Sequence, residues 1–240
     1  MRALSRNVKT TFLRCSFALL IAVLIVSAIQ VHSAGPFSWD VTITEWIQRF
    51  DAGPIASYNK RMGVIGAAGI LGIMIILWLW LKGWRAEAVS IGLVGIADLV
   101  NPLIREVVSR PRPTGELVTI YREPTDFSFP SGTAMHVLMF CGALIYFSGR
   151  VMRPGCLRTT LRILLGLWIP IMGIWVIYRG VHWPSDVLGG YVYGVFFLWA
   201  IIWVYQKYTR WRRAYPKDLI PGNALPPLMR PLTTIFRIVY

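Results

Sequence analysis

Six apolar stretches, each 17 to 20 residues long, recur along this 240-residue chain and limit what it can fold into. They cover residues 12–31, 63–81, 86–104, 131–147, 161–177 and 187–205. A helix needs about 20 apolar residues to cross a hydrocarbon core about 30 Å thick, where it satisfies its own backbone hydrogen bonds. The pattern therefore predicts an all-α, polytopic membrane protein built as a six-transmembrane-helix bundle.

The stretches divide the chain into three predicted parts. Residues 1–11 form the N-terminus, residues 12–206 one six-span domain, and residues 207–240 a tail that is basic and then rich in Pro. The first stretch has two interpretations, because its basic flank, its apolar run and the small residues near its end also fit a cleaved secretory signal. The family resemblance described below favours an uncleaved anchor. We interpret residues 36–62 as an amphipathic connector rather than a helix lying in the membrane surface.

The 25 Lys and Arg residues fall unevenly on the two sides of the predicted bundle. With the N-terminus inside, 17 of them lie in cytoplasmic segments, and cytoplasmic loops are where the excess of basic residues is expected. Both termini are therefore predicted in the cytoplasm. A net charge of +14 could suggest nucleic acid, but no soluble segment is long enough to bind it, so the expected partner is the bilayer. The three cysteines fit no metal-ligand spacing, so no metal site and no structural disulfide is predicted.

Three polar clusters lie between the apolar stretches, all on the predicted extracytoplasmic side: residues 105–113, 129–133 and 181–186. In the first cluster, Arg105 and Arg112 can direct two guanidinium groups at one anion. In the second, Ser131 and Gly132 open a helix whose free backbone N–H groups attract negative charge. Together these two clusters predict a phosphate-binding site.

The third cluster contains the candidate nucleophile. His182 is followed four residues later by Asp186, and an acid at that spacing can fix the tautomer of an imidazole that attacks phosphorus. Asp98, inside a predicted span, is a further ionisable group that needs a partner. It either holds an arginine in place or hydrogen-bonds a neighbouring helix.

The order Arg-Pro-Arg-Pro, Phe-Pro-Ser-Gly and Gly-Val-His-Trp-Pro-Ser-Asp resembles the type 2 phosphatidic acid phosphatase superfamily, which includes membrane lipid phosphatases and is related to vanadium haloperoxidases. The resemblance covers residues 12–206. It implies a nucleophile at His182, an orienting acid at Asp186, and no cofactor or metal, because arginines take the place of a cation. It also implies a phosphate cradle that includes Arg112, Ser131 and Gly132, with Arg105 standing where the family usually has Lys.

Two positions depart from the family pattern. Thr133 stands where the family has the His that protonates the leaving group, and Val176 stands where it has a phosphate-binding Arg. One interpretation is a catalytically inactive member of the family. The other is relocation, because His136 and Arg179 each lie three residues, or about one helical turn, after the vacated position.

The sequence therefore predicts a membrane phosphatase-like protein that hydrolyses a lipid phosphate or isoprenyl diphosphate through a phosphohistidine. Its active site is expected on the extracytoplasmic face of a bacterial-type plasma membrane. Without a general acid, diphosphates would be favoured, since phosphate is a better leaving group than an alkoxide. The alternative is a member that only binds or transports a lipid phosphate. The candidate catalytic residues are His182, Asp186 and His136, and the candidate phosphate-binding residues are Arg105, Arg112, Ser131, Gly132, Thr133 and Arg179.

Overall fold

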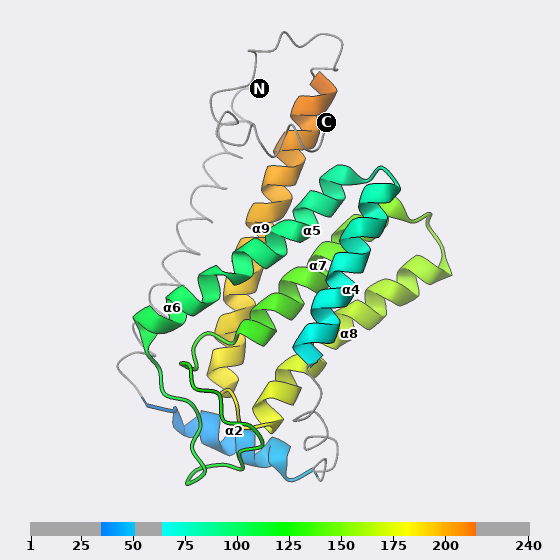
Figure 1. Cartoon of the computed structure of the whole chain (residues 1–240). Coiled ribbons are helices and arrows are strands. Elements are labelled where there is room, and N and C mark those ends of the chain that lie inside the picture. Colours follow the sequence, from blue (N-terminus) through cyan, green and yellow to red (C-terminus); the bar gives the residue numbers. More distant parts are fainter. Residues whose placement is uncertain (1–34, 51–63, 215–240) are drawn as a thin grey trace, which may run out of the picture.

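The computed structural model describes residues 35–50 and 64–214, and all regular structure within these two ranges is helical (Figure 1). The helices are α2 (Ser38–Gln48), α4 (Val64–Leu81), α5 (Arg85–Asp98), α6 (Val100–Val108), α7 (Gly132–Val151), α8 (Cys156–Tyr178) and α9 (Pro184–Ala214). The predicted stretch at 12–31 and most of the predicted tail lie outside the described residues.

Four helical segments are long and apolar enough to cross a membrane: Arg85–Val108, in which α6 continues α5, then Gly132–Val151, Cys156–Tyr178 and Pro184–Arg213. They coincide with the last four predicted stretches. The stretch at 63–81 forms α4, where Gly69–Leu81 is a shorter apolar helix. The prediction of an all-α integral membrane protein is confirmed for the described residues, and the count of six spans stays a prediction.

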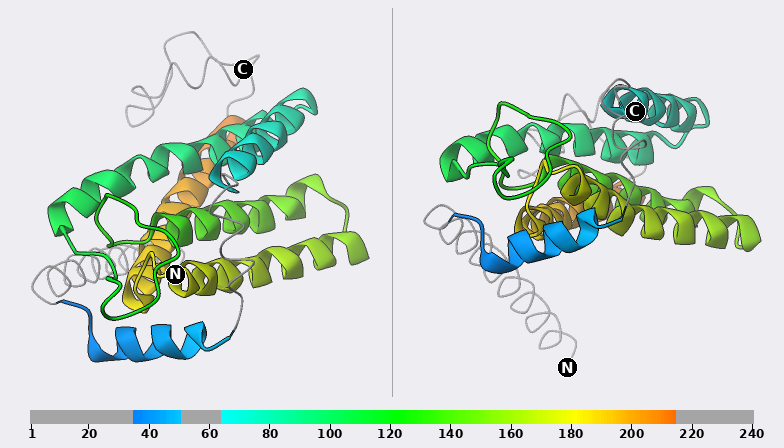
Figure 2. Two further views of the ribbon diagram at one scale, coloured as in Figure 1. Left: turned by 60° about the horizontal axis from the view of Figure 1, so that its bottom comes forward. Right: turned by 90° about the horizontal axis from the view of Figure 1, so that it is seen from below.

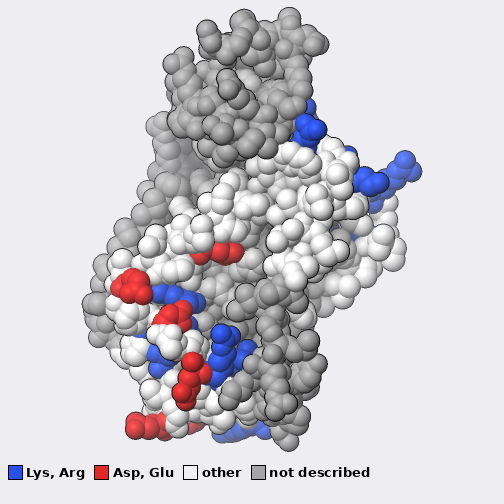
Figure 3. Space-filling model, in the orientation of Figure 1, with Lys and Arg blue, Asp and Glu red and all other residues white. Residues whose placement is uncertain are grey.

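Helix α7 lies at the centre of the bundle and packs against α5, α8 and α9, while α4 packs on α5 (Figures 1 and 2). Charged side chains gather towards the two ends of the bundle and leave its middle mostly uncharged on the face in view (Figure 3). Such a band is expected where helices contact hydrocarbon.

One end of the bundle carries all the elements of the predicted site. The long loop between α6 and α7 folds over this end, beside the turn that joins α8 to α9 (Figure 1). Helix α2 lies across the same end, in contact with α8 and α9 (Figure 2). The segment that we interpreted as a connector thus contains an 11-residue helix, and this helix buries Asp40, Thr44 and Ile47. Its other face exposes Trp39, Ile43 and Trp46.

Helix α9 approaches the start of α7 closely at Gly190. A Cβ atom at this position would lie 2.5 Å from the backbone oxygen of Ser131 and 3.0 Å from Cβ of Ala134. A backbone oxygen cannot rotate away as a side chain does, so the two helices meet at this distance only because residue 190 is glycine.

We expect Gly190→Ala to destabilise the protein by about 1–3 kcal/mol, because the added methyl group pushes α9 away from α7. For a chain of this size, that corresponds to a melting temperature several degrees lower. The measurement is thermal unfolding of the protein in detergent. Gly95→Ala is the matched control, since nothing lies within 4 Å of its Cβ position in α5. Equal melting temperatures for the two variants would contradict the close approach at Gly190.

Candidate active site

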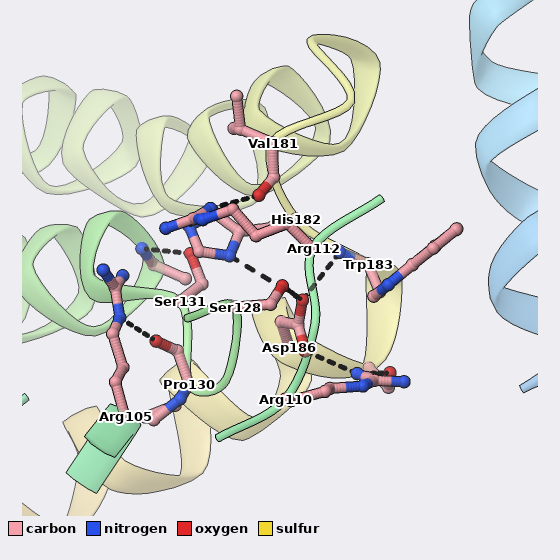
Figure 4. Close-up of polar contacts among 12 residues, drawn as sticks. Arg105, Arg110, Arg112, Ser128, Pro130, Ser131, Val181, His182, Trp183 and Asp186 are labelled. Atoms are coloured by element: carbon pink, nitrogen blue, oxygen red, sulfur yellow. Dashed lines mark hydrogen bonds and ion pairs between the residues drawn. The ribbon is translucent and has the colours of Figure 1, made fainter. Parts of the chain in front are cut away.

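His182 lies in the short turn between α8 and α9, almost completely buried. Its ring has an acid on one side and a cation on the other (Figure 4). Nδ1 lies 3.7 Å from Oδ2 of Asp186, within ion-pair range but too far for a hydrogen bond, and Nε2 lies 3.5 Å from Nη1 of Arg112. Catalytic hydrogen bonds are often this long before a substrate tightens them. The two ring nitrogens therefore have different neighbours: Nδ1 faces the carboxylate of Asp186, and Nε2 faces the guanidinium of Arg112.

Burial lowers the pKa of His182; Asp186 opposes this effect, while Arg112 and Arg105 add to it. The imidazole is therefore neutral at pH 7, and a neutral imidazole has the lone pair that a nucleophile needs.

Asp186 opens helix α9 and is fully buried. Its carboxylate accepts hydrogen bonds from the backbone N–H of Trp183 at 2.8 Å, from the hydroxyl of Ser128, and from Nη1 of Arg110 (Figure 4). With these donors in place the carboxylate has one orientation, and one of its oxygens faces His182. The predicted pairing of His182 with an acid four residues later thus exists as a geometry in the fold.

Arg105 and Arg112 converge on one carboxylate, as the sequence predicted for an anion, but the carboxylate belongs to the chain itself. Asp126 forms ion pairs with Nη1 of Arg105 and with Nη2 of Arg112, the latter at 2.7 Å. Arg105 also donates through Nε to the backbone oxygen of Pro130 at 3.1 Å, and Arg112 donates to the backbone oxygens of Asp126 and Val181. The two guanidinium groups are mostly buried, whereas the side chain of Asp126 is 48% exposed.

Burial opposes the ionisation of Asp126, but the neighbouring Arg105 and Arg112 outweigh it and lower the pKa of this carboxyl. Asp126 is therefore an anion held by both arginines. No pattern in the sequence predicts this partner, since an acid in an exposed loop carries no local signal of the residues that it contacts.

The start of α7 forms the third side of the site. Ser131 is buried, its hydroxyl accepts from the backbone N–H of Ala134 at 3.4 Å, and its own N–H donates to the backbone oxygen of Asp186 at 3.0 Å. A Cβ at Gly132 would lie 3.1 Å from Nη2 of Arg105, so glycine lets the arginine reach the helix opening. Thr133 follows, half-buried, at the second position of the helix. The first N–H groups of a helix have no intrahelical acceptor, so this end of α7 presents donors beside Arg105.

His136 lies four residues beyond Gly132 along α7, and its Nδ1 is hydrogen-bonded to Oδ2 of Asp98 in α5. Its ring stacks on Phe140, with centroids 5.7 Å apart, and its side chain is 39% exposed. Of the two interpretations of Asp98, the bond to a neighbouring helix is confirmed. His136 does not contact His182 or the arginine pair directly, so its catalytic role stays a prediction.

Val176 and Arg179 have different surroundings. Val176 is buried in an apolar cluster with Val181 and Val187, so no cation replaces the family's arginine at that position. Arg179 is also buried, and its Nε and Nη2 have no hydrogen-bond partner among the described residues. Burial lowers the pKa of Arg179, and so does the nearby charge of Arg122. No phosphate ligand of Arg179 is identified by these contacts, and its role in phosphate binding stays a prediction.

Comparison with known proteins gives a consistent family. A model of the PAP2 superfamily matches residues 86–210, from the start of α5 to near the end of α9. Over 120 residues the chain is 28% identical to "Phosphatidylglycerophosphatase B" of Bacillus subtilis (strain 168). This alignment covers 50% of this chain and 58% of that protein. Over 153 residues it is 27% identical to "Putative undecaprenyl-diphosphatase YbjG" of Escherichia coli (strain K12), covering 59% of this chain and 73% of that one. The chain thus spans less than two thirds of the first of these relatives.

Two solved structures share the fold. A transmembrane PAP2 type phosphatidylglycerolphosphate phosphatase from Bacillus subtilis superimposes with a TM-score of 0.61 at 20% identity, covering 82% of this chain and 98% of that one. LpxE from Aquifex aeolicus superimposes with a TM-score of 0.51 at 19% identity, covering 69% and 96%. At these identities the likeness concerns the arrangement of helices alone.

We expect Asp126→Asn to bind inorganic phosphate about fivefold more tightly, because a neutral amide competes less well for Arg105 and Arg112. Two partly exposed ion pairs together stabilise by about 1 kcal/mol, which corresponds to about a fivefold change in Kd. The measurement is inhibition by, or direct binding of, inorganic phosphate. Glu123→Gln removes one negative charge from the same exposed loop and is the matched control. Unchanged or weaker phosphate binding in Asp126→Asn would contradict this assignment of the anion site.

Proposed function

This chain belongs to the PAP2 superfamily, and from that premise we propose that it is a membrane phosphatase that hydrolyses a lipid phosphate or an isoprenyl diphosphate. The observation that carries the proposal is the setting of His182, a neutral imidazole between the carboxylate of Asp186 and the guanidinium of Arg112. The names of the two relatives, a phosphatidylglycerophosphatase and a diphosphatase, support a lipid carrying one or two phosphates as the substrate class.

In the proposed reaction, Nε2 of His182 attacks phosphorus and the bond from phosphorus to the leaving oxygen breaks, which gives a phosphohistidine. Asp186 faces Nδ1 and stabilises the positive charge that develops on the ring. Water then attacks phosphorus and gives a proton to His136, which lost its own proton to the leaving oxygen in the first step. The bond from phosphorus to Nε2 breaks, which releases inorganic phosphate and restores the imidazole of His182. Arg105, Arg112 and the N–H groups that open α7 stabilise the charge on the three equatorial oxygens, after the phosphate has displaced Asp126 from the arginines.

The general acid in this proposal is His136. Asp98 and Arg105 lie seven residues apart on the α5–α6 helix, and they contact His136 and the start of α7 respectively. His136 is four residues beyond Gly132, so it lies about 6 Å further into the bundle than the helix opening. A lipid chain extends from its phosphate into the hydrocarbon, so the leaving oxygen lies on that side of the phosphorus. An ionisable pair held half-exposed at this depth is typical of a functional site.

We further propose that the site faces the extracytoplasmic side of a bacterial-type plasma membrane, with both termini in the cytoplasm. The distribution of Lys and Arg supports this orientation, because Arg150, Arg153, Arg158 and Arg162 all lie around the α7–α8 connection, at the end of α7 away from the site.

We expect His182→Ala to lower phosphate release by about three orders of magnitude or more, as loss of a nucleophile does in other enzymes. The assay is phosphate released from a panel of lipid phosphates and diphosphates by the purified protein, with lipid binding measured in parallel. Retained binding by His182→Ala would show that the variant is folded. A wild-type protein that binds these lipids without releasing phosphate would instead support the binding or transport alternative.

We expect His136→Ala to slow turnover of a lipid monophosphate by about 10²- to 10⁴-fold, because an alkoxide leaving group depends on protonation. A lipid diphosphate should be affected far less, since its phosphate leaving group has a second pKa of about 6. The measurement is kcat for both substrates with each variant. Phe140→Leu removes the stacking ring without removing a proton donor and is the control. An equal loss on both substrates, or no loss on either, would contradict His136 as the acid.

A further inference from the structure

Helix α2 contributes a buried acid to the site, although it lies outside residues 86–210 that match the family model. The side chain of Asp40 is completely buried. Its Oδ1 accepts the backbone N–H of Ser185 at 2.9 Å, and its Oδ2 accepts the hydroxyl of Ser185 at 2.7 Å. Ser185 is the second residue of α9, where backbone N–H groups have no intrahelical acceptor. Asp40 therefore caps helix α9 from a different helix, next to Asp186.

Asp40 also reaches Asp186 through an arginine. The buried guanidinium of Arg110 places Nη2 2.9 Å from Oδ2 of Asp40, and its Nη1 donates to Oδ1 of Asp186 and to the hydroxyl of Ser185. All three charged side chains are at most 1% exposed. Arg110 thus joins an acid of α2 to the acid that faces His182.

The charges of this cluster explain why two acids share one arginine. A guanidinium buried with a single carboxylate would bind it through both arms and neutralise it. With Asp40 taking one arm, Arg110 holds Asp186 through Oδ1 alone. Oδ2 of Asp186 then stays available to Trp183, Ser128 and His182. Removing the charge of Asp40 would leave that arm without its anion and draw Arg110 towards Asp186.

We propose that Asp40 is a positioning residue for the proposed hydrolysis: it divides the charge of Arg110 and caps α9, and so orients Asp186 towards Nδ1 of His182. This role of Asp40 rests on the proposed function, in which His182 is the nucleophile. Asp40 touches neither Arg105 nor Arg112, so its loss affects the chemical step rather than phosphate binding.

The kinetic test compares Asp40→Asn with Glu45→Gln, which removes a negative charge from the exposed face of the same helix. We expect kcat to fall about ten- to a hundredfold in Asp40→Asn, in line with a small displacement of a catalytic group, with KM changed less than about twofold. Glu45→Gln should match the wild type. In an Arg110→Gln background, Asp40→Asn should lower kcat less than about twofold further, because the two residues act through one chain of contacts. A wild-type kcat in Asp40→Asn, or full additivity with Arg110→Gln, would overturn the proposal.

A spectroscopic test decides the same point without turnover. The chain has three histidines, so ¹⁵N-histidine labelling gives three imidazole groups, of which His182 and His136 are assigned by substitution. We expect Asp40→Asn to change the nitrogen shifts of His182 and to leave those of His136, which pairs with Asp98, unchanged. A change in the nitrogen shifts of both histidines would indicate general misfolding. Unchanged nitrogen shifts of His182 would exclude a positioning role for Asp40. Either result overturns the proposal. If the wild type releases no phosphate, the proposed function fails, while this measurement still decides whether Asp40 orients the ring.

Discussion

The buried carboxylate of Asp186 is the interaction on which the rest of the site depends. It draws together the loop between α6 and α7 through Arg110 and Ser128, and the turn before α9 through the N–H of Trp183. Its own backbone oxygen accepts the N–H of Ser131 at the start of α7. Arg110 and Asp186 form a buried ion pair. Removing one partner of such a pair typically destabilises a protein by about 3–5 kcal/mol, because the other charge is then left buried without compensation. The contacts that orient Asp186 towards His182 therefore also hold this end of the bundle together.

Arg105 and Arg112, on another side of the site, differ from this buried cluster because the carboxylate that they bind is partly exposed. Arg105 and Arg112 are mostly buried, and burial together with the nearby charge of Arg105 lowers the pKa of Arg112, so the pair needs an anion whether or not a substrate is present. Asp126 supplies it from the loop between α6 and α7, with 48% of its own side chain exposed. In our proposal, substrate binding exchanges one anion for another. The gain in affinity then comes from the extra oxygens and charge of a phosphate, and from the N–H donors at the start of α7.

The sequence predicted the features that depend on residues close together in the chain. Apolar stretches of span length became helices α5 to α9, and a His with an Asp four residues later became a facing pair on one turn. The convergence of Arg105 and Arg112 also followed from their motif. The partners that complete these groups could not be predicted in the same way, because Asp40 lies 145 residues from the Ser185 that it caps, and Asp126 lies 21 residues from Arg105 without any periodic pattern. Such contacts depend on how helices pack, and a single sequence does not carry that information in its spacing.

The two departures from the family pattern, at Val176 and Thr133, have different physical consequences. Val176 packs with Val181 and Val187, next to the turn that carries the imidazole. Apolar surroundings exclude water, and burial is the main reason that the pKa of His182 is lowered. In our proposal the phosphate contacts come from Arg105, Arg112 and the start of α7. Proton donation, which Thr133 cannot supply near pH 7, falls in our proposal to His136, one turn deeper, where the chain of a lipid substrate would leave. In our proposal the chemistry therefore does not need a His at position 133 or an Arg at position 176, because His136 donates the proton and Arg105 and Arg112 hold the phosphate.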